Sequence, residues 1–221
     1  MTARSKTVRI KLSNGDSIAS VLRSPPHFEK AVVIANGAGA AMDHEFISYF
    51  HEALADSGYL SVKFNFPYQE HGRRAPDSKG RLEDCYLRVY AYLVEQIGIT
   101  PDAIVLGGKS MGGRIASQIA NRTQIKKLVF LGYPLHAPGR PDRLKTAHLG
   151  AVRARMLFLQ GDRDRLADIE KLRQTIATLP KARLVEFAGA DHSFAVPKKS
   201  GIDPETLRQR MVNAMCKFIG P

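Results

Sequence analysis

Apolar residues along the chain fall into two patterns, short unbroken runs and longer stretches in which they recur with the period of a helix. The short runs are rich in Val, Ile, Leu and Phe and occupy residues 31–35, 60–66, 103–106, 128–131, 156–160 and 184–187. Unbroken runs of this kind are typical of strands buried on both faces of a sheet. The amphipathic stretches between them predict helices over residues 43–57, 82–97, 111–122, 168–179 and 204–219.

The start of the chain has a different pattern, because apolar and polar residues alternate over 8–12 and 17–23 around Asn14-Gly15. This pattern predicts a β-hairpin, since Asn-Gly readily adopts the positive φ angles of a tight turn. A hairpin followed by alternating strands and helices predicts an α/β fold: a mostly parallel sheet of about eight strands with helices on both faces. The length of 221 residues and the 44% apolar content suit one domain over 1–221.

Composition excludes several classes of protein. No apolar run approaches the ~18 residues of a membrane span, and the N-terminus lacks the apolar segment of a secretory signal, so we expect a cytoplasmic protein without a membrane partner. Cys85 and Cys216 have no metal-ligand spacing, so neither a disulfide framework nor a metal site is expected. The formal net charge is +12, but the basic residues are spread along the chain without a nucleic-acid-binding motif. Nucleic acid is therefore not the favoured partner.

A glycine-rich segment follows the run at 103–106 and leads into an amphipathic stretch. Within it, Gly108-Lys109-Ser110-Met111-Gly112 fits the pattern G-x-S-x-G, in which a sharp strand-to-helix turn exposes the serine hydroxyl. This nucleophile elbow makes Ser110 the candidate nucleophile. The alternative is a glycine-rich turn with a capping serine. The spacings of dinucleotide-binding and P-loop motifs are absent.

A serine nucleophile needs a base and an acid that orients the base. Of the seven histidines, only His192 follows the final apolar run, so it is the candidate base, with an exposed loop histidine as the alternative. Asp162 and Asp164 follow the run at 156–160. We favour Asp164 as the acid, because Asp162 has the features of a turn former, and Asp162 is second choice. Asp168 is expected to cap the next helix.

Tetrahedral intermediates of acyl transfer also need an oxyanion hole. The run at 31–35 leads into the glycine-rich segment 36–40, which suits a loop that presents backbone N–H groups. We therefore assign the oxyanion hole to the amides of Ala38 and Met111, the latter being the residue after the nucleophile. The alternative is a βα turn that binds nothing.

With the order Ser, Asp, His in place, the chain resembles the α/β-hydrolase superfamily over nearly its whole length. Within it, the chain is most similar to small hydrolases related to dienelactone hydrolase, and especially to the testis-expressed-thirty and non-specific-lethal-complex type. Segments that carry the likeness are NGAG at 36–39, FNFPY at 64–68, GRRAPD at 72–77, GGKSMGGR at 107–114 and GYPLH at 132–136. Many members of the superfamily have His where Asn36 stands, but an asparagine can also hold the loop by hydrogen bonds.

Related enzymes often insert a helical lid between the runs at 128–131 and 156–160, whereas here the segment 133–154 is short, Pro-rich and basic. The resemblance therefore implies a minimal lid and an open, shallow site for a small acyl substrate. Several cations in or beside the strand-end loops are compatible with an anionic substrate and equally with a solvated surface; they are Arg73, Arg74, Lys109, Arg114, His136 and Arg140.

We therefore interpret the sequence as that of a carboxylesterase-like serine hydrolase that cleaves an ester, thioester or similar acyl bond without a cofactor or metal. Two alternatives stay open. One is a catalytically weak binding or scaffold protein that keeps the fold, and the other is a polyanion binder that uses the positive charge.

Overall fold

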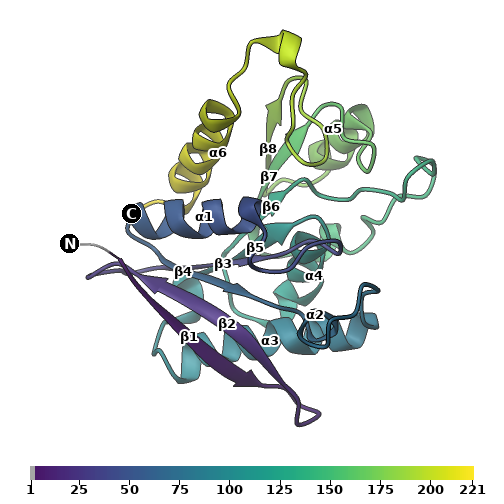
Figure 1. The fold of residues 1–221 in the computed structure, drawn as a ribbon. Coiled ribbons are helices and arrows are strands. Elements are labelled where there is room, and N and C mark those ends of the chain that lie inside the picture. The colour runs from purple at the N-terminus through teal and green to yellow at the C-terminus, as the bar shows by residue number, and fades with distance from the viewer. Residues whose placement is uncertain (1–2) are drawn as a thin grey trace.

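The computed structural model describes residues 3–221, which form one eight-stranded sheet in the order β1-β2-β4-β3-β5-β6-β7-β8 (Figure 1). β1 pairs antiparallel with β2 and β2 with β4, whereas every later pair is parallel. The predicted mostly parallel sheet with a leading hairpin is thus confirmed. The strands are β1 (Arg4–Lys11), β2 (Ser17–Ser24), β3 (Ala31–Ala35), β4 (Leu60–Phe64), β5 (Ile104–Lys109), β6 (Lys127–Leu131), β7 (Arg155–Gly161) and β8 (Ala182–Phe187).

Helices cover both faces of the sheet. α1 (Glu45–Asp56) and α6 (Pro204–Ile219) lie together on one face, and α3 (Lys79–Glu95), α4 (Met111–Ile119) and α5 (Ile169–Ala177) lie on the other (Figure 1). A single short turn, α2 (Pro67–Glu70), follows β4. The cap expected at Asp168 is confirmed, since Asp168 accepts a hydrogen bond from the Lys171 amide at the start of α5. Asp203 caps α6 in the same way, by accepting from the Thr206 amide.

α3 begins at Lys79, three residues before the predicted start at 82. The prediction began too late because the first turn of the helix is polar and carries no apolar periodicity. Its N-cap residue, Ser78, forms no side-chain capping bond. The apolar pattern locates only the part of a helix that packs on the core, so the boundary at its polar end is the part that the pattern misses.

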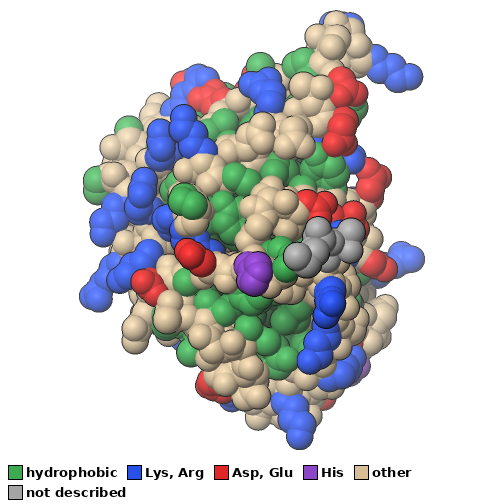
Figure 2. Space-filling model, turned by 90° about the vertical axis from the view of Figure 1, so that its left-hand side faces the viewer, with side chains coloured by type: hydrophobic (Ala, Val, Ile, Leu, Met, Phe, Trp, Pro, Cys, Tyr) green, Lys and Arg blue, Asp and Glu red, His purple; other side chains and the backbone are tan. Residues whose placement is uncertain are grey.

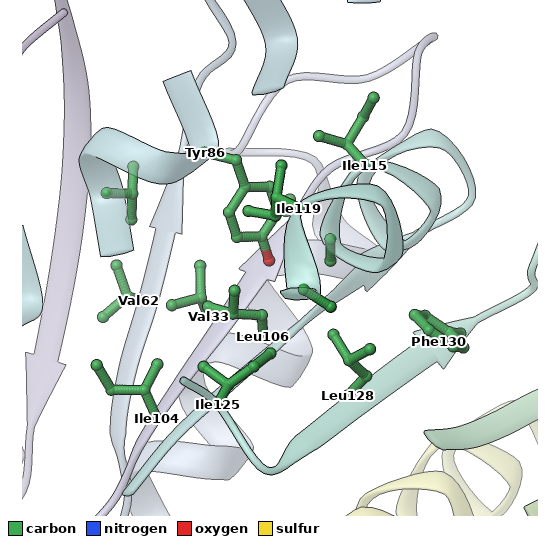
Figure 3. Close-up of a cluster of buried hydrophobic side chains, with 14 of the residues drawn as sticks. Val33, Val62, Tyr86, Ile104, Leu106, Ile115, Ile119, Ile125, Leu128 and Phe130 are labelled. Carbon is green, nitrogen blue, oxygen red and sulfur yellow. The ribbon is translucent and has the colours of Figure 1, made fainter. Parts of the chain in front are cut away.

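The core between the sheet and α3 and α4 is shown in Figure 3, where Val33, Leu106 and Leu128 of the strands face Ile119 of α4. Tyr86 of α3 lies in this layer, fully buried. Its hydroxyl donates to the Gly107 carbonyl at 2.6 Å and accepts from the Gly107 amide at 3.0 Å. This contact fixes β5 near its carboxyl end, where the candidate nucleophile follows.

The surface charge is distributed over many places. On the face in Figure 2, Lys and Arg side chains lie at several separate positions, with Asp and Glu between them. Several Lys and Arg side chains of the described chain form ion pairs, for example Arg9 with Glu70 at 2.7 Å and Arg73 with Asp77 at 2.6 Å. No helix within residues 3–221 has both the length and the apolar character needed to cross a bilayer.

Candidate active site

The turn from β5 to α4 presents Ser110 in a strained conformation. Its φ of 51° and ψ of −115° lie in a region that residues with a side chain rarely adopt. The glycines on either side of Ser110 make this turn possible, because their backbone lies too close to neighbouring carbonyl groups for a side chain to fit. A Cβ on Gly108 would lie 2.4 Å from the Ala35 carbonyl oxygen, and one on Gly112 would lie 2.6 Å from the carbonyl oxygens of Ala35 and Asn36. The G-x-S-x-G glycines are therefore required by contact with β3 and the loop after it.

Ser110, His192 and Asp164 form a hydrogen-bonded chain. Ser110 Oγ lies 2.9 Å from His192 Nε2, and His192 Nδ1 lies 2.6 Å from Asp164 Oδ2. The Asp164 side chain is fully buried, and 26% of the His192 side chain is exposed. A carboxylate at Nδ1 holds the ring proton there, so that Nε2 is free to accept the serine proton. The structure thus brings together the three side chains that the sequence selected.

Two further groups fix the Asp164 carboxylate. The Gln160 amide donates to Oδ2 at 2.6 Å, and the Leu166 backbone N–H donates to Oδ1 at 2.7 Å. Sequence reasoning missed Gln160, although a polar residue at the end of an otherwise apolar strand is a signal that could have found it. Asp162, the second choice for the acid, accepts from the Gly189 amide at 2.7 Å and so holds the loop that leads to His192.

The glycine-rich loop after β3 is held by the side chain of Asn36, which is fully buried. Its Nδ2 donates to the Gly37 carbonyl at 3.0 Å and to Gln69 Oε1 at 2.9 Å. The Tyr68 hydroxyl donates to the Ala38 carbonyl at 2.9 Å, which orients that part of the loop. Asn36 therefore stabilises the loop by hydrogen bonds, as expected for the departure from histidine.

The two amides assigned to the oxyanion hole flank the nucleophile. Ala38 lines the same cavity as Ser110, and Met111 is the first residue of α4. Among the described residues, neither the Ala38 nor the Met111 N–H donates a hydrogen bond to another protein group. Both donors are thus available to a ligand, and their part in an oxyanion hole stays a prediction.

Ser110 and His192 line a cavity of about 600 Å³. The glycine-rich loop, the start of α1 and Arg208 of α6 form its other walls. Arg208 was not anticipated from the sequence; it pairs with Glu45 at 2.7 Å. The segment 132–154 contains only the single turn η3 (Leu149–Ala151) and contributes no lining residue, in agreement with a minimal lid.

Of the six cations selected from the sequence, only Lys109 lines this cavity, and the other lining cation, Arg208, is paired with Glu45. His136 is buried, with its Nε2 accepting from the Asp168 amide at 2.9 Å, so it is a structural residue. Arg73 is paired with Asp77, and neither Arg114 nor Arg140 contributes to the lining. The contacts of the cavity therefore do not favour an anionic substrate over a neutral one.

Lys109 is an unusual feature of the site. Its Nζ is buried without a hydrogen-bond partner, 5.9 Å from the centre of the Phe194 ring. Burial lowers the pKa of Lys109 to about 8, against the opposing effect of Asp164 and Asp191. Phe194 itself has a positive φ of 61° and lies in the loop that carries His192. Lys109 thus precedes the strained Ser110 in the chain and lies over the ring of the strained Phe194.

A second serine–histidine contact lies elsewhere. Ser117 Oγ of α4 is 2.8 Å from His148 Nε2, but Ser117 is only 2% exposed and donates to the Arg114 carbonyl at 2.6 Å. No carboxylate of the described chain contacts His148, and neither residue lines the cavity with Ser110. This pair therefore lacks the parts of an activated nucleophile. Within residues 3–221, no cluster of three His, Cys, Asp or Glu side chains could hold a metal ion.

Comparisons with known proteins agree with this architecture. Residues 28–220 match the family model described as an alpha/beta hydrolase domain. The structure is similar to an alpha-beta serine hydrolase homologue from Coxiella burnetii, with 20% identity, a TM-score of 0.77 and coverage of 97% of this chain and 98% of the other.

It is also similar to a lidless serine hydrolase from Xanthomonas campestris, with 18% identity, a TM-score of 0.75 and coverage of 99% and 96%. For dienelactone hydrolase from Anabaena variabilis the identity is 22%, the TM-score 0.75 and the coverage 96% and 97%. At these identities the solved structures support the fold, and the family model matches most of the sequence. The chain is a member of the alpha/beta hydrolase domain family.

Proposed function

We propose that the protein is a serine hydrolase that cleaves a carboxylic ester, thioester or similar acyl bond of a small substrate. The observation that carries the proposal is the hydrogen-bonded chain from Ser110 through His192 to Asp164, which begins at a strained serine on the wall of an open cavity. The volume of this cavity, about 600 Å³, falls in the range of small-molecule sites.

In the proposed reaction, Ser110 Oγ attacks the substrate carbonyl carbon while His192 Nε2 takes the hydroxyl proton. Asp164 stabilises the imidazolium that forms, and the Ala38 and Met111 amides bind the oxyanion. Collapse of the tetrahedral intermediate breaks the acyl bond, and His192 donates its proton to the leaving group. Water then attacks the acyl-enzyme with His192 as base, which releases the acid and restores Ser110.

A matched pair of variants tests this mechanism, because two serines lie within hydrogen-bond distance of a histidine. They are Ser110, just before α4, which contacts His192, and Ser117, within α4, which contacts His148. Wild type, Ser110→Ala and Ser117→Ala are treated with a fluorophosphonate probe and assayed on p-nitrophenyl acetate and butyrate. We expect wild type and Ser117→Ala to be labelled and active, and Ser110→Ala to be neither. Wild-type protein that folds but neither reacts with the probe nor hydrolyses either ester would overturn the proposal and favour the scaffold alternative.

A further inference from the structure

A second hollow, of about 290 Å³, lies between the start of α3, the side of α4 and residues 144–148. It shares no lining residue with the cavity at Ser110, which is bordered by helices of the opposite face of the sheet. We call it the cationic hollow, and the side chains that define it are Lys79, Arg114, Gln118, Leu144, Lys145 and His148.

The charges of the cationic hollow are poorly compensated. Three cations line it, and no Asp or Glu is among the lining residues. Glu83 lies nearby but is shared between Lys79 at 3.5 Å and Arg122 at 3.4 Å. Arg114 and Lys145 form no ion pair within residues 3–221, and Arg114 Nε is buried without a hydrogen-bond partner. A buried guanidinium N–H normally has a partner, so this donor is free to bind an acceptor atom of a ligand.

His148, which lines the cationic hollow, contacts a serine that is not itself part of the lining. Ser117 Oγ donates to the Arg114 carbonyl at 2.6 Å and lies 2.8 Å from His148 Nε2, and the Tyr133 hydroxyl lies 3.3 Å from the same nitrogen. His148 Nδ1 has no protein partner in the described chain. Burial, Arg114 and Lys79 together lower the pKa of His148 below its ordinary value. A bound anion would oppose that effect, so anion binding and proton uptake by His148 are coupled.

The start of α3 adds positive potential at the same place. Ser78 forms no side-chain cap, the first turn has no acidic residue, and its first residue, Lys79, lines the hollow. The free N–H groups and the positive end of the helix dipole therefore have no anionic partner from the protein. Gln118 Oε1 is also buried without a donor, which suits a ligand that carries a hydroxyl beside its negative charge.

We propose that the cationic hollow binds a phosphate group, as inorganic phosphate or as a small phosphate monoester, with Arg114 as its principal ligand. Three cations that line one hollow match a dianion with several acceptor oxygens better than a single carboxylate. Leu144, 42% exposed at the rim, offers an apolar surface to the organic part of a monoester. This site is independent of the proposed hydrolase reaction, because it uses none of its residues.

Binding of inorganic phosphate, phenyl phosphate and benzoate is measured by calorimetry at fixed ionic strength, on wild type, Arg114→Met and Arg183→Met. Arg183 is an exposed arginine of β8, so its variant has the same loss of charge far from the hollow. We expect saturable phosphate binding that Arg114→Met weakens at least tenfold and Arg183→Met leaves unchanged. Tighter binding of phenyl phosphate than of inorganic phosphate identifies a monoester, and equal binding identifies the free ion.

The His148 ring is followed by NMR in the same proteins, after circular dichroism has shown that they are folded. Phosphate should raise the pH at which this ring titrates in wild type and Arg183→Met, and not in Arg114→Met. Ser110→Ala should bind phosphate like wild type, which separates this test from that of the hydrolase. The proposal fails if wild type shows no saturable binding, if both arginine variants weaken it equally, or if benzoate binds as tightly as phenyl phosphate.

Discussion

Replacing Lys109 by methionine should stabilise the protein. The buried ammonium has no hydrogen-bond partner, and burial lowers the pKa of Lys109 from 10.5 to about 8. Each tenfold change in proton affinity corresponds to about 1.4 kcal/mol, so keeping this lysine charged costs the folded state about 3 kcal/mol at pH 7. Methionine has a similar shape without the charge. We therefore expect Lys109→Met to raise the free energy of unfolding by up to about 3 kcal/mol at pH 7.

The effect should depend on pH with a defined sign. Between pH 8 and 10.5 the unfolded chain holds more protons than the folded chain at this position, so the wild-type protein becomes relatively more stable as the pH rises. The advantage of Lys109→Met should shrink from about 3 kcal/mol at pH 7 to about 1 kcal/mol at pH 10.

Urea unfolding followed by circular dichroism at both pH values measures this, with the exposed Lys198→Met as the reference. A variant less stable than wild type at pH 7, or a gain as large at pH 10 as at pH 7, would refute the reasoning.

Three further changes test other contacts. Burial lowers the pKa of His51 to about 3, whereas the same histidine in the unfolded chain takes up a proton near pH 6.5. Wild type should therefore lose about 2 kcal/mol of stability between pH 7 and pH 5, and urea titrations of His51→Gln should lack this loss. Gly112→Ala places a Cβ against the Ala35 carbonyl and should cost about 2–4 kcal/mol in thermal unfolding and abolish esterase activity. Gly80→Ala, in α3 with no atom within 4 Å of the added Cβ, should keep the activity and leave the stability unchanged or raise it by up to about 1 kcal/mol. Asp164→Asn should keep the fold but lower kcat roughly 10³–10⁴-fold, because an amide favours the wrong imidazole tautomer; steady-state kinetics showing a loss under tenfold would contradict its role.

Local patterns were enough to predict much of this fold. Runs buried on both faces identify the parallel strands, and Asn14-Gly15 identifies the hairpin, whose Gly15 has a φ of 89°. The chain order of the motifs also selected three side chains that the structure places in contact. Their catalytic roles stay predictions, since contact alone does not establish a reaction.

Contacts between distant segments could not be predicted in this way. The placement of β2 beside β4 depends on how separate elements pack, and no local pattern encodes it. Burial of Lys109 and the place of Arg208 on the cavity wall also depend on packing between distant segments. The bond from Gln160 to Asp164 is different, because it joins two residues that are close in the sequence. A lysine or arginine in a sequence is expected at the surface, and only the folded environment shows otherwise.

The hydrogen-bonded chain at the site joins residues 82 and 28 positions apart, on loops that follow three different strands. We expect contacts over such separations to form only once β5, β7 and β8 are in register, because those strands carry the three loops. His192 is carried by a loop with few buried side chains, so this end of the site can open while the sheet stays intact. Hydrogen exchange should therefore show faster opening of residues 189–196 than of β5, and activity should disappear at lower urea concentrations than the helical signal.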